Sequence, residues 1–140
     1  MTDTQAVQRE IEELHRFFQA WLTGDAPRGP GELDRCAKVL APGFTLITPV
    51  GHVWGSAALL EMLQASWGSR PGFRLWVEDT HVLVSTPETV VARYVEHQHR
   101  DGSRTARLST AVFLRLGEAR QDLAWLTVHE TWMAPSEESP

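Results

Sequence analysis

Four long stretches in the second half of the chain constrain the fold more than any other feature of the sequence. They are rich in valine, leucine, threonine and aromatic residues, which favour β-strands. They cover residues 73–85, 89–100, 105–116 and 123–133. Short turn-forming segments separate them, among them Thr86-Pro87-Glu88 and Asp101-Gly102. Because connections this short join antiparallel neighbours, the sequence predicts a meander of four antiparallel strands.

The first half of the chain has the periodicity of helices instead. Between Val7 and Leu22, apolar residues recur at spacings of three and four, which predicts one buried face on a long helix. That face comprises Val7, Ile11, Leu14, Phe18, Trp21 and Leu22, and Phe17 widens it. We expect His15, on the same helix, to lie at the surface.

Two further helices and a hairpin complete the predicted elements. A short helix is expected over residues 33–40, and a hairpin over 44–54 turns at Val50-Gly51. A third helix takes Ser56 as its N-cap and ends at Gly68. Helices followed by a curled antiparallel sheet predict an α+β domain whose helices cover one face of the sheet.

Length and charge limit the classes of protein that fit. A chain of 140 residues has the size of one domain, so we expect a single domain over residues 1–134 and a disordered polar tail over 135–140. The formal net charge of −5 argues against nucleic acid and anionic membranes as partners. The start of the chain lacks a signal peptide and no apolar run is long enough to span a membrane, so we expect a soluble, cytoplasmic protein.

The basic residues and the cysteine content add two smaller points. Every basic residue except Lys38 is arginine, which is typical of a GC-rich bacterial genome. Cys36 is the single cysteine, so no internal disulfide can form, and we expect it to be an inert core thiol.

The turn at Asp101-Gly102 predicts which residues face each other on its two strands. A two-residue turn places Glu96 opposite Arg107 and Tyr94 opposite Ser109, all on one face of the sheet. The other face carries Val95, Leu108 and Val112, with Trp125 expected beside them on the last strand. Because both faces are apolar and one helical layer covers only one of them, we expect the second face to be buried by self-association.

Three local strings in this order resemble the nuclear transport factor 2-like superfamily, of the polyketide cyclase (SnoaL-like) and ketosteroid isomerase kind. They are Trp-Leu-Thr-Gly-Asp over 21–25, Phe-Thr-Leu-Ile-Thr-Pro-Val-Gly over 44–51 and Trp-Leu-Thr-Val-His-Glu-Thr-Trp over 125–132. The resemblance implies a cone-shaped, cystatin-like fold, with N-terminal helices packed on a curved antiparallel sheet. It also implies an apolar pocket between the sheet and the first helix, and a homodimer.

The catalytic residues of the isomerase branch are missing from the matching positions. Its general-base carboxylate falls at Thr48, its donor tyrosine at Phe17, and its neutral carboxylic acid near Ala111. Proton abstraction beside a carbonyl needs a base and an oxyanion donor within hydrogen-bond reach. We therefore do not expect steroid-isomerase chemistry.

The expected pocket is an apolar cup that contains a few polar groups. Register and resemblance place Tyr94, Glu96, Arg107, Ser109, Phe113, Val128, Glu130 and Trp132 on its face, and Phe17 and Trp21 are expected to wall it. Extending the strand pairing adds Asp79 and His81, although a bulge is expected near Asp79. Burial can bring Glu130 toward neutrality, so that it acts as an acid or base together with His81 or Asp79. The alternative is a structural ion pair of Glu130 or Glu96 with Arg107.

No metal or cofactor site is predicted. His97 and His99 share a strand face, yet the register places them beside Ala106 and Arg104 rather than beside a carboxylate, so we expect solvated side chains. No glycine-rich phosphate loop, nucleophile elbow or Cys-x-x-Cys pair is present.

Three functions remain open. The one favoured by the residues is a homodimeric small-molecule-binding protein, whose small apolar or carboxylate-bearing ligand is held by Arg107, Tyr94 and Glu130. The second is an acid-base enzyme (a cyclase, hydratase or isomerase) that uses Glu130. The third is an oligomerisation module that acts through the outer sheet face.

Overall fold

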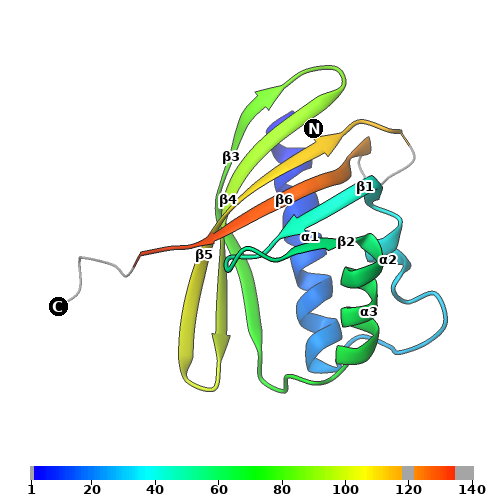
Figure 1. Ribbon diagram of the computed structural model, residues 1–140, viewed down its shortest axis with the longest axis vertical. Helices are drawn as coiled ribbons and strands as arrows, with labels where there is room; N and C mark the ends of the chain where they lie inside the picture. The colour runs from blue at the N-terminus through cyan, green and yellow to red at the C-terminus, as the bar shows by residue number, and fades with distance from the viewer. Residues whose placement is uncertain (1, 118–121, 135–140) are drawn as a thin grey trace.

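A computed structural model describes residues 2–117 and 122–134, and it places the helices on one side of a six-stranded sheet (Figure 1). The elements in chain order are α1 (Asp3–Thr23), α2 (Asp34–Ala37), β1 (Leu40–Ile47), β2 (Val53–Gly55), α3 (Ser56–Ser66), β3 (Arg74–Ser85), β4 (Thr89–Arg100), β5 (Ser103–Leu114) and β6 (Ala124–Trp132). The α+β class predicted from the sequence is confirmed. The predicted tail over 135–140 lies outside the described residues.

The sheet has the strand order β2-β1-β6-β5-β4-β3. Strands β3 to β6 form the predicted antiparallel meander, and β4 and β5 pair with Glu96 opposite Arg107 and Tyr94 opposite Ser109, which confirms the predicted register. Strand β1 runs parallel to β6, with Leu46 opposite Val128. Periodicity does not encode this pairing between distant segments, and the sequence did not predict it.

Helix α1 crosses the inner face of the sheet, the face that the helices cover (Figure 1). Its N-terminus is capped by Thr2, whose hydroxyl accepts from the Gln5 amide while the Gln5 side chain accepts from the Thr2 amide. Val7 and Ile11 on its apolar stripe are fully buried, and with Phe113 and Trp125 they belong to the hydrophobic core. The buried stripe predicted from the spacing is confirmed.

The end of α1 is tied to the segment that leads from α3 into β3. Trp21 donates its indole N–H to the Leu63 carbonyl at 2.6 Å, and the Gly68 amide donates to the Trp21 carbonyl at 3.0 Å. Gly24 has φ +87° and a Cβ there would lie 3.3 Å from the Gly68 Cα, so both the conformation and the close approach favour glycine. These contacts position the loop that carries Arg70, whose amide donates to the Leu22 carbonyl at 2.9 Å.

Two helix boundaries differ from the prediction. Helix α2 has four residues rather than the expected eight, and α3 has Gly55 as its N-cap, so that Ser56 is its first helical residue. Among the residues that the structure describes, no side chain donates or accepts a capping hydrogen bond at the start of α3. A serine at this position therefore marks the correct start of the helix but does not cap it.

Two irregularities interrupt the pairing of β3 with β4. The register shifts between Glu78 and His81, where Asp79 has φ +56°, and shifts again between Val82 and Val84. The first shift confirms the predicted bulge near Asp79. It also places His81 opposite Arg93, on the outer face of the sheet, which faces away from the helices. The second shift was not predicted.

Candidate functional site

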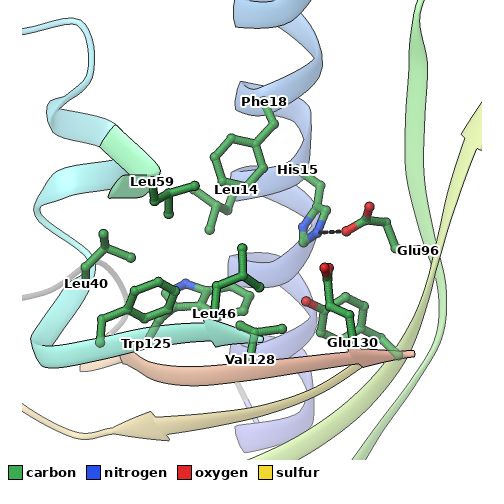
Figure 2. A pocket seen from close by; sticks show the side chains of 12 residues that line it. Leu14, His15, Phe18, Leu40, Leu46, Leu59, Glu96, Trp125, Val128 and Glu130 are labelled. Carbon is green, nitrogen blue, oxygen red and sulfur yellow. Dashed lines mark hydrogen bonds and ion pairs between the residues drawn. The ribbon is translucent and has the colours of Figure 1, made fainter. Parts of the chain in front are cut away.

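A small hollow, here called the inner chamber, lies between α1, α3 and the sheet (Figure 2). Its volume is about 70 Å³. It is lined by Leu14, His15, Phe18, Leu40, Phe44, Leu46, Leu59, Tyr94, Glu96, Trp125, Val128 and Glu130. Most of these side chains are apolar, and the ionisable ones gather at one side, where Figure 2 shows His15, Glu96 and Glu130 near one another.

A larger hollow, here called the vestibule, adjoins the inner chamber and has a volume of about 350 Å³. The two hollows share Phe18, Leu46, Leu59, Glu96 and Glu130. The vestibule is also lined by Leu22, Thr48, Trp54, Met62, Leu63, Arg70, Phe73, Leu75, Gln98, Arg100 and Arg107. The carboxyl groups of Glu96 and Glu130 therefore stand where an apolar chamber meets a more polar space.

A network of charged side chains connects helix α1 to three strands at this junction. His15 Nε2 lies 3.0 Å from Glu96 Oε1, and Gln98 donates to Glu96 Oε2 at 2.6 Å. Arg107 places Nε 3.5 Å from Glu96 Oε2 and donates from Nη1 to Glu130 Oε1 at 3.0 Å. Arg107 thus bridges the two carboxylates, and both glutamates are buried.

The two glutamates have different protonation properties. Burial disfavours the charge of Glu96, but the hydrogen bond and charge of His15, with help from Arg107, lower its pKa overall. Burial and the charge of Glu96 raise the pKa of Glu130 to about 7, against the opposing effect of Arg107. One carboxyl group is thus held ionised while its neighbour exchanges a proton near neutral pH, a division of roles that is typical of acid-base sites.

His15 and Tyr94 are the other titratable groups of the chamber. Burial opposes protonation of His15, but its hydrogen bond to Glu96 and the charge of that residue raise its pKa overall. Burial, together with the charges of Glu96 and Glu130, raises the pKa of Tyr94 well above its usual value. Tyr94 is therefore a neutral phenol at physiological pH, and it is available as a hydrogen-bond donor.

Some predicted site residues meet at the junction. Tyr94, Glu96 and Glu130 line the inner chamber, and Arg107 lines the vestibule, as expected. Trp132 is 46% exposed at the end of β6, and the Arg107 guanidinium lies 4.8 Å from its ring centroid. Trp132 thus packs on the arginine of the network rather than lining either hollow.

Other predicted site residues lie elsewhere. Asp79 and His81 are exposed on β3, because the register shift between Glu78 and His81 removes them from the inner face. Phe113 and Trp21 are buried in the core, where Phe113 packs on Trp125 at 4.5 Å, and Phe17 stacks on Trp21 at 6.0 Å. Their apolar area is used for packing and does not line the two hollows.

Ser109 and His97 also have surroundings that the sequence did not indicate. Ser109 is completely buried opposite Tyr94, and it lines neither hollow. His97, expected to be solvated, stacks on Trp76 with 5.1 Å between ring centroids and has a side chain only 15% exposed.

The expectation that His15 lies at the surface is wrong. Its side chain is buried, and its ring contacts the Ile11 carbonyl at 2.8 Å as well as Glu96. The spacing carried the signal, because His15 follows Ile11 by four residues and precedes Phe18 by three. Position on the apolar stripe predicts burial even when the side chain is polar.

Glu10 is a second buried polar residue that the sequence analysis missed. It is fully buried, and its carboxylate accepts from Trp125 Nε1 at 2.8 Å and from Arg35 at 3.2 Å. It follows Val7 by three residues, again on the stripe. This group ties α2 to α1 and lines neither hollow, so we assign it a structural role.

The described residues offer no metal site and no membrane-spanning helix. Within residues 2–117 and 122–134, no three histidine, cysteine, aspartate or glutamate side chains are placed to hold a metal ion. No helix in this part of the chain is both long and apolar enough to cross a membrane. Burial raises the pKa of the Cys36 thiol to about 12, which leaves it unreactive.

Comparison with known proteins places the chain in a family. The sucrose-6-phosphate phosphohydrolase C-terminal family matches residues 7–134. The chain belongs to this family. Probable sucrose-phosphatase 3a of Arabidopsis thaliana is 24% identical to this chain over 132 residues. The match covers 91% of this chain and only 30% of that protein, so the chain spans under a third of the length of this relative.

Solved structures confirm the nuclear transport factor 2-like resemblance. An NTF-2 like protein of unknown function from Pseudomonas aeruginosa is 33% identical, with a TM-score of 0.83 over 92% of this chain and 99% of that one. An uncharacterised protein with a cystatin-like fold from Caulobacter vibrioides is 17% identical, with a TM-score of 0.66 over 94% and 90% of the two chains. The CaMKII hub of S. rosetta is 15% identical, with a TM-score of 0.72 over 95% and 98%. The last two likenesses show the fold alone.

Proposed function

We propose that this member of the family binds a small molecule in the inner chamber and vestibule, with an apolar part among the leucines and a polar part at the Glu96–Arg107–Glu130 junction. The carrying observation is that charged, buried side chains converge where an apolar chamber opens into a wider one. Binding sites combine apolar walls with a few convergent polar groups in this way.

Energetics also favour a binding role for the network. A buried ion pair gains little over well-packed apolar residues, because desolvation offsets its attraction. An unfilled chamber also costs packing energy. Apolar residues at positions 96, 107 and 130 would stabilise a purely structural core equally well. The desolvation free energy of these three charged side chains is therefore better explained by a role in ligand binding.

The test is a ligand screen by thermal shift, followed by a crystal structure with the strongest hit. Because of its family, the panel includes sucrose and phosphorylated sugars beside apolar and carboxylate compounds. Leu46 lines both hollows, so Leu46→Phe should abolish the ligand-induced shift while leaving the unliganded melting temperature within a few degrees. Leu83→Phe, at an exposed site on β3, is the matched control and should respond like the unmodified chain. Silence of the whole panel, or a ligand bound outside both hollows, contradicts the proposal.

Acid-base catalysis is the second candidate, and one observation favours it. Glu130 Oε1 accepts from Arg107, whereas the described residues provide no hydrogen bond to Glu130 Oε2. A carboxyl group that is half bonded, borders the chamber and has a pKa raised to about 7 is suited to proton exchange with a bound molecule. Its partners in the chamber are His15 and Tyr94, in place of His81 and Asp79. Glu130→Gln should abolish turnover of any substrate found and leave its binding within a few-fold.

Self-association is the third candidate. One structural neighbour is named a hub and another an association domain, with TM-scores of 0.72 and 0.62. We propose that a homodimer forms through the outer face, where Val95, Leu108 and Val112 lie on neighbouring strands. The expectation that Trp125 joins them was wrong, because the β5–β6 register shifts between Val112 and Phe113 and Trp125 lines the inner chamber instead. Light scattering at micromolar concentration tests this, and Leu108→Glu should convert a dimer to a monomer. A monomeric unmodified chain contradicts it without affecting the binding proposal.

A further inference from the structure

Three arginines from three different segments line the vestibule. Arg70 precedes β3, Arg100 ends β4 and Arg107 lies in β5. The carboxylates that line the same hollow are Glu96 and Glu130. Positive groups thus outnumber negative ones by three to two among the described lining residues, in a chain whose formal net charge is −5.

Arg107 pairs with buried carboxylates, whereas among the described residues Arg70 and Arg100 do not. Arg107 bridges Glu96 and Glu130, as described above. Among the described residues, Arg70 makes no ion pair, and its guanidinium lies 5.3 Å from the centroid of the Phe73 ring. Arg100 forms an ion pair with Asp101 at 3.8 Å, and both side chains are exposed, Arg100 to 54% and Asp101 to 87%. Two guanidinium groups of the vestibule therefore have no buried counter-charge.

The three arginines line the same hollow, so their positive charges act on one another. Burial lowers the pKa of Arg70, and the positive charges of Arg100 and Arg107 lower it further. The three guanidinium groups repel one another, so an anion bound between them is stabilised by all three positive charges. An arginine fork also matches the geometry of carboxylate and phosphate oxygens.

The backbone holds Arg70 in place before any ligand arrives. Its amide donates to the Leu22 carbonyl at 2.9 Å, and its own carbonyl accepts from the Phe73 amide at 3.1 Å. The Arg70 residue is thus fixed between the end of α1 and the start of β3, and its guanidinium rests on an aromatic ring. A preorganised cation loses less entropy when it binds an anion.

We propose that Arg70 and Arg100 bind the anionic head of a small organic acid, a carboxylate or a phosphate monoester, whose apolar end enters the inner chamber. This inference rests on the proposed binding function and adds the chemical class of the ligand. The chamber volume of about 70 Å³ limits the apolar end to a short chain, since one water already needs about 10–15 Å³ of such space. Leu22, Met62 and Phe73 give the vestibule apolar walls beside the arginines.

The experiment is isothermal titration of the full chain with matched acidic and neutral probes. The probes are butyrate, hexanoate and octanoate, their primary amides, butyl phosphate, and inorganic phosphate alone. At least one acid should bind ten-fold or more tightly than its amide. The double variant Arg70→Gln/Arg100→Gln should abolish that preference, whereas Arg93→Gln, an exposed arginine on the outer face, should retain it. Butyl phosphate against butyrate identifies which anionic head is preferred.

The outcomes separate this inference from the function on which it rests. If an acid and its amide bind equally, or if the double variant keeps the preference, the arginine site is wrong while small-molecule binding stands. If inorganic phosphate binds as tightly as butyl phosphate and none of the carboxylic acids binds, the chamber does not take an apolar end, and the inference fails in that part. If none of the probes binds and the wider panel is also silent, the binding function itself is overturned. Circular dichroism of the double variant confirms that it is folded.

Discussion

His15 Nε2 lies 3.0 Å from Glu96 Oε1, although 81 positions separate the two residues. The contact joins the middle of α1 to the middle of β4 inside the core, and the side chains of both residues are less than 10% exposed. It therefore contributes to the stability of the fold and to the charge state of the candidate site at the same time.

Replacement of His15 by alanine should destabilise the protein by about 3 kcal/mol, because it leaves the buried Glu96 carboxylate without its imidazole partner. Urea denaturation at pH 7 measures the change. His52→Ala is the matched control, since that side chain is exposed, and it should cost less than about 0.5 kcal/mol. Equal effects of the two substitutions would show that the buried contact is not stabilising.

The raised pKa of Glu130 predicts how stability depends on pH. The folded pKa of about 7 exceeds the ordinary value of 4.5, so the folded protein binds more protons than the unfolded chain between these limits. The contribution of Glu130 to stability is thus complete below about pH 4.5 and is lost as the pH rises through 7. Glu130→Gln cannot ionise, so relative to the unmodified protein it should gain on the order of 3 kcal/mol between pH 4.5 and 8. Paired denaturation curves across this range measure the difference, and parallel curves would contradict the assignment.

Replacement of Arg107 by methionine should cost about 3 kcal/mol at pH 7, because two buried carboxylates then lose their shared cation. The loss should shrink at pH 5, where Glu130 is protonated and fewer negative charges repel one another. Arg93→Met, on the exposed outer face, is the control and should change stability by less than about 0.5 kcal/mol. A pH-independent loss in Arg107→Met would indicate lost packing rather than lost charge.

Asp79→Gly should leave stability unchanged or raise it by up to about 1 kcal/mol, because Asp79 has φ +56° and glycine adopts that conformation without strain. It should leave ligand affinity unchanged, and so should His81→Ala, since both side chains are exposed on β3 away from the two hollows. Thermal denaturation and ligand titration of both variants check this. A ten-fold loss of ligand affinity in either variant would show that the substituted residue takes part in binding.

Much of the fold follows from local patterns, because turn chemistry and side-chain alternation act over a few residues. The Asp101-Gly102 turn was enough to predict Glu96 opposite Arg107, and hence half of the charged network. The resemblance of the closing strand placed Glu130 on the same face, where it accepts from Arg107. These residues were predicted correctly because the strand alternation between them is uninterrupted.

The remainder depends on features that leave no local pattern. The register shift between Glu78 and His81 moves His81 to the outer face, and the residue types there do not show which face the residues after the bulge take. The polarity of His15 favours a surface position, whereas its place on the apolar stripe of α1 predicts the burial that the structure shows. Arg70 lies in the loop before β3 and Arg100 at the end of β4. They line the same hollow only in the complete tertiary structure, so no local pattern predicts it.

The position of β6 between β1 and β5 has a consequence for how the chain is made on the ribosome. Until Ala124–Trp132 has left the exit tunnel, the nascent chain holds two unjoined pieces of sheet, the β1–β2 hairpin and the β3–β5 meander. The strand that joins them also brings Glu130 and Val128 to the hollow. Translation of β6 is therefore the step that both joins the two pieces of sheet and completes the lining of the inner chamber, and a ribosome stalled before β6 would display neither.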